Sequence, residues 1–267
     1  MVDNKSFRYG DGLFETMKVV NQKIILGKYH FERFFAGLKL IQFEIPGSLS
    51  PRKLTRQIYR LCKKNNCNEL ARIRLSAFRG NGNINDGINK LDYIIECGPA
   101  NKSVNEFNGH GLVLGLYPDA KKSCDAFSNI KSANFLPYVM AAQYAKQNKL
   151  DDCLILNMHD RIADTTIANI FLVRDKKIIT PPLSEGCING VMRRYLLEQL
   201  TNGKYNVEEK PVTQNDLEKA DEVFLTNAMF GIRWVKQFNN KAYSYSQTTK
   251  IYKQIVEPLW NINSSEK

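Results

Sequence analysis

The sequence predicts a mixed α/β protein of two domains, residues 1–117 and residues 118–267. Some stretches repeat their apolar residues with helical spacing, whereas others are short and alternating or continuously apolar, as strands are, and both kinds occur along the whole chain. The polar stretch DAKKSCDAFSN separates the two halves, so we place the domain boundary at its start. With 267 residues, 43% of them hydrophobic, the chain can bury a substantial core.

The first half is predicted to hold several strands and two helices. Two strands, TMKVV and IILG, flank a turn at NQK, and a helix over YHFERFFAGLKLI follows. A second helix begins with Ser50 as its N-cap and Pro51 in its first turn. Its apolar face is made of Leu54, Ile58, Leu61 and Cys62. The stretches ARIRLSAF, LDYIIECG and GLVLGLYP are then predicted as strands.

The second half is predicted to open with a helix from Lys131 to about Gln147. Strands are expected at DCLILN, IANIFLV and KKIITP, with a hairpin through MHDR. A helix over VMRRYLLEQLTNG ends at Asn202 and Gly203, a usual C-terminal stop. The strand YNVEEKPV, the short capped helix TQNDLEKA and the apolar stretch DEVFLTNAMFGIRWV complete this half.

Charge and hydropathy limit the possible partners. The net charge of +11 could indicate binding to nucleic acid, an anionic membrane surface or an anionic small molecule. Because the basic residues are spread along the chain without an RNA-binding motif or a zinc finger, we expect no nucleic-acid partner. No run of about 18 apolar residues is present, and the first residues, MVDNKSFRYGDG, lack the apolar core of a signal peptide. We therefore expect a soluble, cytoplasmic protein without a membrane partner.

The six cysteines are scattered and form no CxxC pair, and the chain has three histidines. Cys62 and Cys67 are the closest pair and lie on or just after a predicted helix. Without a secretion signal we expect free thiols rather than disulfides, and the composition predicts no metal site.

Four features are candidates for chemistry, and each has a structural alternative. Lys131 is either a reactive amine or a surface charge at a helix start, and Asp164 is either a functional carboxylate or a turn residue that binds backbone amides. Asn189 and Gly190 open a helix whose amides could bind a phosphate, or they simply cap it. Arg33 is either a phosphate ligand or a solvated helix charge. Together they are the parts that a pyridoxal phosphate site requires.

The motifs resemble those of the fold-type IV pyridoxal phosphate enzymes, the class IV aminotransferase family. YGDGLFETMKV, YHFERF, IKSANFLP, DRIADTTIANIFLV and TPPLSEGCINGVMRRYLLE occur in the order found in that family and cover nearly the whole chain. The family includes branched-chain and D-amino acid aminotransferases and 4-amino-4-deoxychorismate lyase. The resemblance implies a two-domain α/β fold with the cofactor at the domain interface, and a homodimer.

The resemblance also implies roles for individual residues. Lys131 is expected to form the Schiff base with pyridoxal 5'-phosphate and to move the substrate proton, and Asp164 is expected to pair with the pyridine nitrogen. Asp164 stands where the family usually has glutamate. Because the side chain of aspartate is shorter by one methylene group, the cofactor ring or the strand must shift for the carboxylate to reach the pyridine nitrogen. The expected phosphate ligands are Arg33, Asn189, Gly190, Val191, Met192, Asn227 and Ala228.

Within the family, the lyase is the expected activity. NGVMRR resembles the lyase motif N-G-I-M-R, and TNAMFGIRWV resembles its C-N-A-L-M-P-V. The loop RGNGNIND lacks the arginine and histidine with which D-amino acid aminotransferases hold the substrate carboxylate. We expect Phe14, Arg79 and Arg233 to contact a substrate with two carboxylates, although either arginine could be a solvent-facing loop residue. The alternatives are a class IV aminotransferase acting on branched-chain or other amino acids, and a non-catalytic basic binding protein.

Overall fold

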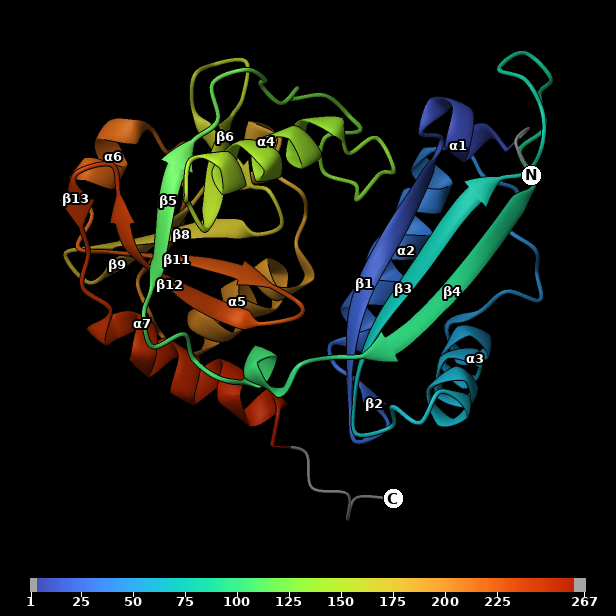
Figure 1. Ribbon diagram of the computed structural model, residues 1–267, viewed down its shortest axis with the longest axis horizontal. Coiled ribbons are helices and arrows are strands. Elements are labelled where there is room, and N and C mark those ends of the chain that lie inside the picture. Colours follow the sequence, from blue (N-terminus) through green and yellow to red (C-terminus); the bar gives the residue numbers. More distant parts are fainter. Residues whose placement is uncertain (1–3, 262–267) are drawn as a thin grey trace. The chain divides into compact units, whose positions relative to one another are not determined.

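The computed structural model describes residues 4–261 (Figure 1). These residues divide into two compact units. The first consists of residues 4–104 with residues 130–135 and 261, and the second of residues 105–129 and 136–260. This division differs from the boundary that we placed at residues 117 and 118, and it assigns Lys131 to the first unit instead of the second. The reason is that a short segment of the chain returns to the first unit and pairs with its sheet.

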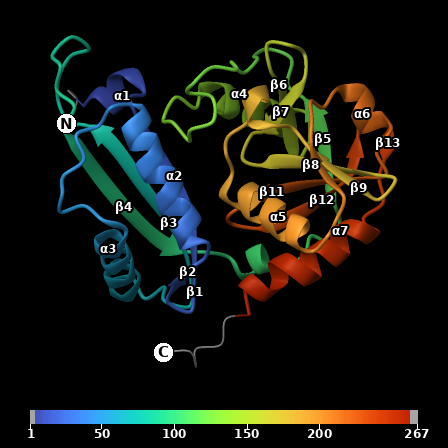
Figure 2. The same ribbon diagram turned by 180° about the vertical axis from the view of Figure 1, so that it is seen from behind.

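The first unit contains a four-stranded antiparallel sheet, with the strands in the order β2-β1-β3-β4 among the residues described. Its elements are α1 (Lys5–Tyr9), β1 (Gly12–Val20), β2 (Lys23–Ile24), α2 (Gly27–Leu40), α3 (Pro51–Lys64), β3 (Leu70–Arg79) and β4 (Leu91–Pro99), followed by a 3-10 turn (Lys102–Asn105). Helix α2 lies along the sheet, as Figure 2 shows, and contacts β1, whereas α3 contacts β4.

The core of the first unit lies between one face of this sheet and the two long helices. Successive side chains of a strand point to opposite faces of the sheet, so Leu13 and Met17 of β1 point to the same face. They belong to one core cluster with Phe34 of α2 and Ile58 of α3. Helix α3 starts as predicted, because the Ser50 hydroxyl accepts a hydrogen bond from the Lys53 amide at 3.3 Å and a proline occupies the first turn.

The second unit is built on a larger mixed sheet. In the part of the chain that is described, eight of its strands lie in the order β10-β9-β8-β11-β12-β5-β6-β7, and β13 pairs with β12. The strands are β5 (Leu112–Leu116), β6 (Asp152–Leu156), β7 (Ile162–Thr165), β8 (Asn169–Arg174), β9 (Lys177–Thr180), β10 (Val207–Glu209), β11 (Glu222–Asn227), β12 (Gly231–Phe238) and β13 (Lys241–Ala242). The sheet curls, because β7 contacts β8 and the Thr165 amide donates to the Ala168 carbonyl at 2.9 Å.

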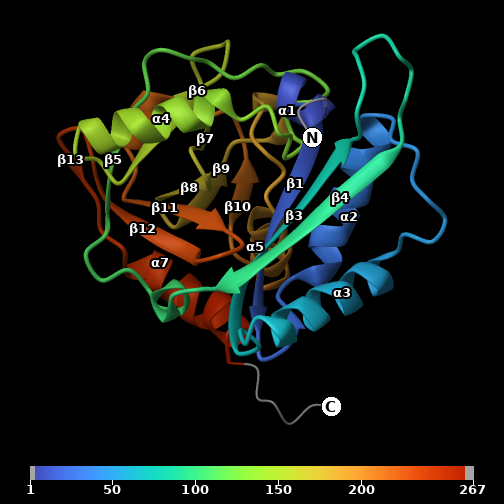
Figure 3. The same ribbon diagram turned by 45° about the vertical axis from the view of Figure 1, so that its right-hand side comes forward.

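Helices cover the second sheet. They are α4 (Leu136–Gln147), α5 (Val191–Asn202), α6 (Gln214–Glu218) and α7 (Ser246–Ile251); a 3-10 turn (Leu183–Glu185) precedes α5, and a π-helical turn (Tyr252–Val256) and a further 3-10 turn (Glu257–Leu259) follow α7. Helix α4 packs on β6, as Figure 3 shows, and α5 packs on β11. No helix among residues 4–261 is long and apolar enough to cross a membrane.

The predicted helix from Lys131 is wrong at its start. Helix α4 begins at Leu136, and Lys131 lies in an extended segment. This segment adds to the free side of β1, where the Phe14 amide donates to the Lys131 carbonyl at 2.9 Å and the Ala133 amide donates to the Gly12 carbonyl at 2.8 Å. Because the backbone of residues 131–133 is committed to the sheet, it is not free to form a helical turn.

Candidate active site

Lys131 is held at a fixed position beside β1 in the first unit. The two backbone hydrogen bonds to Phe14 and Gly12, with the bridge between Leu13 and Ser132, fix the main chain on both sides of the lysine. Its Nζ atom lies over two aromatic rings, 4.6 Å from the centre of Phe14 and 5.1 Å from that of Phe135. The two rings meet edge to face, with their centres 5.4 Å apart. The amine therefore sits in an aromatic environment and not in an exposed charge cluster.

The Phe14 ring also contacts a second cation. The ring is buried, and the Arg74 guanidinium stacks on it at 3.8 Å from the ring centre. Arg74 belongs to β3 and is half-buried, with a carboxylate oxygen of Glu96 3.8 Å from its Nε. No local pattern in the sequence points to Arg74, because only the pairing of β1 and β3 brings it to Phe14.

A buried polar group made of Glu15, His30 and Arg33 lies in the same unit. Arg33 donates from Nε to one carboxylate oxygen of Glu15 at 2.8 Å and from Nη2 to the other at 2.6 Å. The Nδ1 atom of His30 lies 2.7 Å from the same carboxylate. Burial alone would raise the pKa of Glu15, but Arg33 and the hydrogen bond from His30 outweigh it, so the pKa falls from 4.5 to about 2.

His30 is completely buried and its ring is neutral at neutral pH. Burial lowers the pKa of the ring below 6.5, the positive charges of Arg33 and Lys131 lower it further, and only Glu15 opposes them. Nδ1 therefore carries the proton donated to Glu15. The other ring nitrogen, Nε2, is buried and has no hydrogen-bond partner among the described residues.

Asp164 lies in the second unit, on β7, with almost no exposure to solvent. Its Oδ2 atom accepts three hydrogen bonds: from the Tyr138 hydroxyl at 3.0 Å, from the Ile188 amide at 3.0 Å and from Lys122 Nζ at 3.2 Å. Burial and the neighbouring carboxylate raise the pKa of Tyr138 well above 10, so its hydroxyl keeps the proton that it donates. Lys122 also contacts the Tyr138 hydroxyl.

The two oxygens of Asp164 differ in their remaining capacity. Among the described residues, the hydrogen-bond donor near Oδ1 is the Tyr138 hydroxyl, at 3.3 Å, and this hydroxyl lies closer to Oδ2. A carboxylate can accept about four hydrogen bonds through its two oxygens. Oδ1 is therefore the oxygen that can accept a further donor.

The loop before α5 is held by two asparagines. Asn129 donates through its side chain to the carbonyls of Leu183 and Cys187 at 2.8 and 2.7 Å, and its own carbonyl accepts the Asn189 amide at 2.9 Å. Asn169 donates to the Ile188 carbonyl at 2.8 Å. A Cβ atom at Gly190 would come within 1.9 Å of the Asn169 side-chain oxygen, so glycine is required for this close approach.

The N-terminus of α5 lacks a side-chain cap from its N-cap residue. That residue is Gly190, which supplies no side-chain oxygen for the first amides of the helix. Val191 and Met192 are buried and stand in that first turn. Uncapped amides at the positive end of a helix of 12 residues are suited to a phosphate group.

Asn227 and Ala228 form the turn at the end of β11. The Asn227 side-chain oxygen accepts the amides of Met229 and Phe230 at 2.9 and 3.0 Å, and its amide group donates to the Ile167 carbonyl at 3.3 Å. Ala228 lies half-buried in this turn. The preceding Thr226 has a buried hydroxyl without a hydrogen-bond partner in the described part of the chain, so this turn has a polar group to offer to a ligand.

Arg79 and Arg233, the two arginines predicted to bind the substrate, both make contacts within their own units. Arg79 stacks on Phe43, donates from Nε to the Asn89 side chain at 3.0 Å, and pairs with Asp11 and the Ile41 carbonyl. It also lines a hollow of 320 Å³. Arg233 donates to the Glu106 carbonyl at 2.8 Å. Their predicted role at the substrate remains a prediction.

Comparison with known proteins identifies the family. The family described as amino-transferase class IV matches residues 12–238. The chain belongs to the class IV aminotransferases. These are pyridoxal phosphate enzymes, and the mixed α/β fold of two units agrees with that of their solved structures.

Relatives of this chain within the class IV family include proteins with two different activities. It is 29% identical to the aminodeoxychorismate lyase of Vibrio harveyi, over 86% of this chain and 83% of that one. A structure of a putative 4-amino-4-deoxychorismate lyase from Legionella pneumophila has a TM-score of 0.85 at 24% identity and covers 95% of this chain and 92% of its own. The branched-chain aminotransferase of the archaeon Thermoproteus uzoniensis, solved with norvaline, has a TM-score of 0.88 at 21% identity and covers 97% of this chain and 89% of its own.

The residues of both units fit pyridoxal phosphate. The primary amine of Lys131 is fixed beside aromatic rings, Oδ1 of Asp164 can accept a donor such as a protonated ring nitrogen, and the uncapped amides of α5 suit a phosphate. Arg33 is bound to Glu15 through two of its nitrogens, so its predicted contact with phosphate would have to be made beside that ion pair.

Several polar residues near the candidate residues were not predicted from the sequence. In the first unit they are Glu15, His30 and Arg74, and in the second unit they are Lys122, Tyr138 and Thr226. A signal existed for Glu15, because it is a charged residue between Leu13 and Met17 on the core-facing side of a strand, where an unpaired charge is too costly. No comparable signal existed for Lys122 and Tyr138, because they meet Asp164 only through tertiary structure.

Proposed function

We propose that this chain is a 4-amino-4-deoxychorismate lyase that releases pyruvate and 4-aminobenzoate for folate biosynthesis. The observation that favours the lyase is the run NGVMRR at the N-terminus of α5, which resembles the lyase motif at the expected phosphate site. The 29% identity with the Vibrio harveyi lyase over most of both chains supports it. The loop RGNGNIND contains neither the arginine nor the histidine that would favour D-amino acids.

Each polar group has a proposed role at the cofactor. Lys131 would hold the cofactor through its amine and would act as the base that moves the substrate proton. Asp164 would pair with the pyridine nitrogen through Oδ1, and Lys122 and Tyr138 orient the carboxylate through Oδ2. Asn189 to Met192, Asn227, Ala228 and Arg33 would hold the phosphate. Pyridoxal phosphate supplies an electron sink for the carbon from which the proton is taken.

The aromatic surroundings of Lys131 suit a general base. Lys131 takes the proton from the ring carbon that bears the amino group, the enolpyruvyl C–O bond breaks, and the ring becomes aromatic. The bond's electron pair leaves with the oxygen as the enolate of pyruvate, which takes up a proton on its CH2 carbon to become pyruvate. Phe14 limits the access of water to the amine, and Arg74, stacked on the same ring, is a candidate for a carboxylate of the substrate, together with the predicted Arg79 and Arg233.

The first experiment tests the cofactor. Purified protein is expected to bind pyridoxal phosphate and to absorb visible light, and Lys131→Ala should lose the absorption band of the lysine-linked cofactor and at least about a thousandfold in turnover. Lys121→Ala is the matched control, because Lys121 is exposed and pairs only with Asp160 among its recorded contacts. Wild-type protein without any affinity for pyridoxal phosphate would contradict the whole proposal.

The second experiment separates the activities. Release of pyruvate and 4-aminobenzoate from 4-amino-4-deoxychorismate is measured beside amino transfer from L- and D-amino acids to 2-oxo acids. Elimination without transfer is the expected result. Transfer from branched-chain amino acids without elimination would establish the alternative, a class IV aminotransferase, whose fold the Thermoproteus uzoniensis enzyme shares with this chain. Salt-sensitive retention on DNA by colourless protein would instead identify a non-catalytic basic binding protein.

A further inference from the structure

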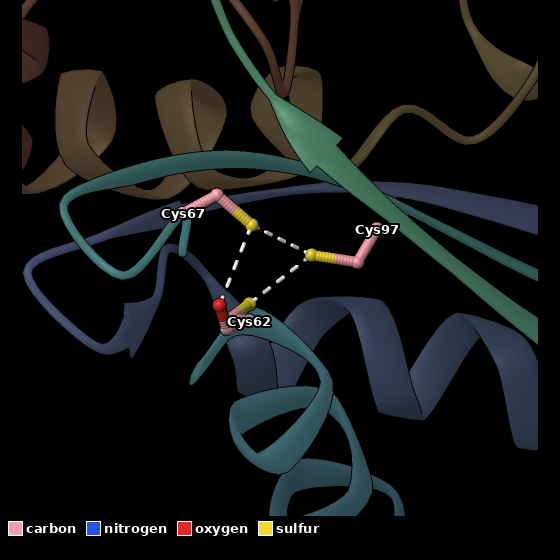
Figure 4. A group of neighbouring side chains, drawn as sticks. All are labelled: Cys62, Cys67 and Cys97. Carbon is pink, nitrogen blue, oxygen red and sulfur yellow. Dashed lines mark hydrogen bonds between the residues drawn. The ribbon is translucent and has the colours of Figure 1, made fainter. Parts of the chain in front are cut away.

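The side chains of three cysteines, Cys62, Cys67 and Cys97, meet in the first unit. Cys62 lies in the last turn of α3, Cys67 lies in the turn that follows it, and Cys97 lies on β4, an edge strand of the four-stranded sheet. Figure 4 shows the three sulfur atoms pointing toward one another. Neither the family match nor the proposed lyase reaction uses these residues.

The sulfur atoms are close enough to share one ligand. Cys97 Sγ lies 3.1 Å from Cys67 Sγ and 3.5 Å from Cys62 Sγ, and all three atoms lie within 4.8 Å of one another. Cys62 and Cys67 are buried and Cys97 is half-buried, which leaves one side for entry. A metal ion needs at least three cysteine, histidine or acidic side chains whose ligand atoms lie close together. Among residues 4–261, these three cysteines are the set that meets this condition.

We propose that Cys62, Cys67 and Cys97 bind one thiophilic metal ion, Cu(I), through three thiolates. Soft thiolate ligands select Cu(I) over the harder divalent ions. Structural zinc sites almost always have four ligands, and no histidine or carboxylate joins this group in the described residues. A site of three sulfurs therefore fits a three-coordinate ion.

Binding requires only small movements. A metal–sulfur bond of about 2.3 Å places sulfurs that share a metal roughly 4 Å apart. Cys97 Sγ, 3.1 Å from Cys67 Sγ and 3.5 Å from Cys62 Sγ, therefore has to move less than about 1 Å away from each. The turn that carries Cys67 and the edge strand that carries Cys97 are the parts that would move. Because the sulfurs come from α3, the turn and β4, the ion would cross-link the end of the helix to the edge of the sheet.

The protons and charges of the step balance. Each thiol loses its proton to water as its Cu–S bond forms, so three protons are released, and copper stays in the Cu(I) state throughout. Three thiolates and one Cu(I) carry a charge of −2. Lys63 and Lys64 follow Cys62 in the last turn of α3 and add positive charge to this end of the helix.

A disulfide is the competing use of these thiols. It would join two of the three sulfurs, with Cys67 and Cys97 the nearest pair, and it would leave Cys62 outside the bond. It would also need an oxidant to accept two electrons. The convergence of a third sulfur favours the metal site.

The test is a competition between the protein and a chelator for Cu(I) under anaerobic conditions. The protein is loaded with its cofactor, and all of its thiols are reduced. Protein is titrated into the coloured Cu(I) complex of bicinchoninate. Wild type should remove one equivalent per chain and should show an upward shift of its melting temperature in Cu(I). Cys97→Ser is expected to lose the tight equivalent and the shift. It is the variant of choice because Cys97 is the least buried ligand.

The matched control is Cys124→Ser, which removes an exposed cysteine outside the cluster and should bind like wild type. Near-native circular dichroism and cofactor absorbance of Cys97→Ser exclude misfolding as the cause of a loss, and Cys62→Ala provides a second test on a different ligand. Equal uptake by wild type and both cluster variants would overturn the proposal. A Cys67–Cys97 disulfide found in cells whose thiols are trapped during lysis would also overturn it, in favour of a redox role.

Discussion

At the scale of single residues, Glu15 shows how a buried charge is stabilised. It is ionised on the core side of β1 because Arg33 binds both of its oxygens and His30 donates a hydrogen bond to one of them. Leaving a buried carboxylate without these partners would be very costly. The positive charge of Lys131 also lowers the pKa of His30, so this buried group and the proposed reactive amine belong to one electrostatic environment.

This ion pair predicts sensitivity to acid. The pKa of Glu15 in the folded protein, about 2, is below its ordinary value of 4.5, so its contribution to stability is complete above pH 4.5 and is lost as the pH falls toward 2. The contribution is on the order of 3 kcal/mol. Glu15→Gln should therefore lower the free energy of unfolding at pH 7 by about that amount, and the deficit relative to wild type should shrink at pH 3. Urea unfolding at the two pH values measures this.

Glu44→Gln, a change at an exposed glutamate, is the control and should track wild type at both pH values. A deficit of Glu15→Gln that stayed constant between pH 7 and pH 3 would show that Glu15 is not ionised as described.

At the scale of elements, α3 is the clearest case of a helix that can be predicted from its sequence. Its cap and its proline occur at the positions expected, and Leu54, Ile58 and Cys62 of its predicted apolar face are buried, whereas Leu61 is only half-buried. The extended segment around Lys131 is the opposite case, because its local pattern favours a helix and pairing with β1 overrides it. A helix also needs several free consecutive residues, whereas a bridge needs only a partner strand.

The cap of α3 gives a prediction about this element. Ser50→Ala removes the acceptor for the Lys53 amide and should lower the free energy of unfolding by about 1 kcal/mol. Ser48→Ala is the matched control, because Ser48 is exposed and its hydroxyl only accepts a long bond from the Lys53 side chain. The measurement is chemical unfolding followed by circular dichroism. A loss at Ser48 as large as that at Ser50 would contradict the role of the cap.

At the scale of the whole molecule, the family resemblance implies a homodimer. We expect the protein in solution to have twice the mass of one chain, as measured by light scattering on the eluate of a sizing column over a range of concentrations. The expected dimer should persist in moderate salt, because a net charge of +11 on each chain repels its partner and salt screens that repulsion. A single-chain mass at all concentrations would contradict this prediction.

The sequence by itself determined the family, the alternation of helices and strands and the main candidate residues, because apolar periodicity, capping residues and ordered motifs are local features of the chain. The tertiary structure decided which residues surround them. Lys131 joins the first unit through pairing with β1, Tyr138 and Lys122 meet at Asp164, and Cys97 reaches Cys62 and Cys67. These contacts join residues that are far apart along the chain, and no local pattern records them because only the pairing of strands and the packing of helices brings such residues together.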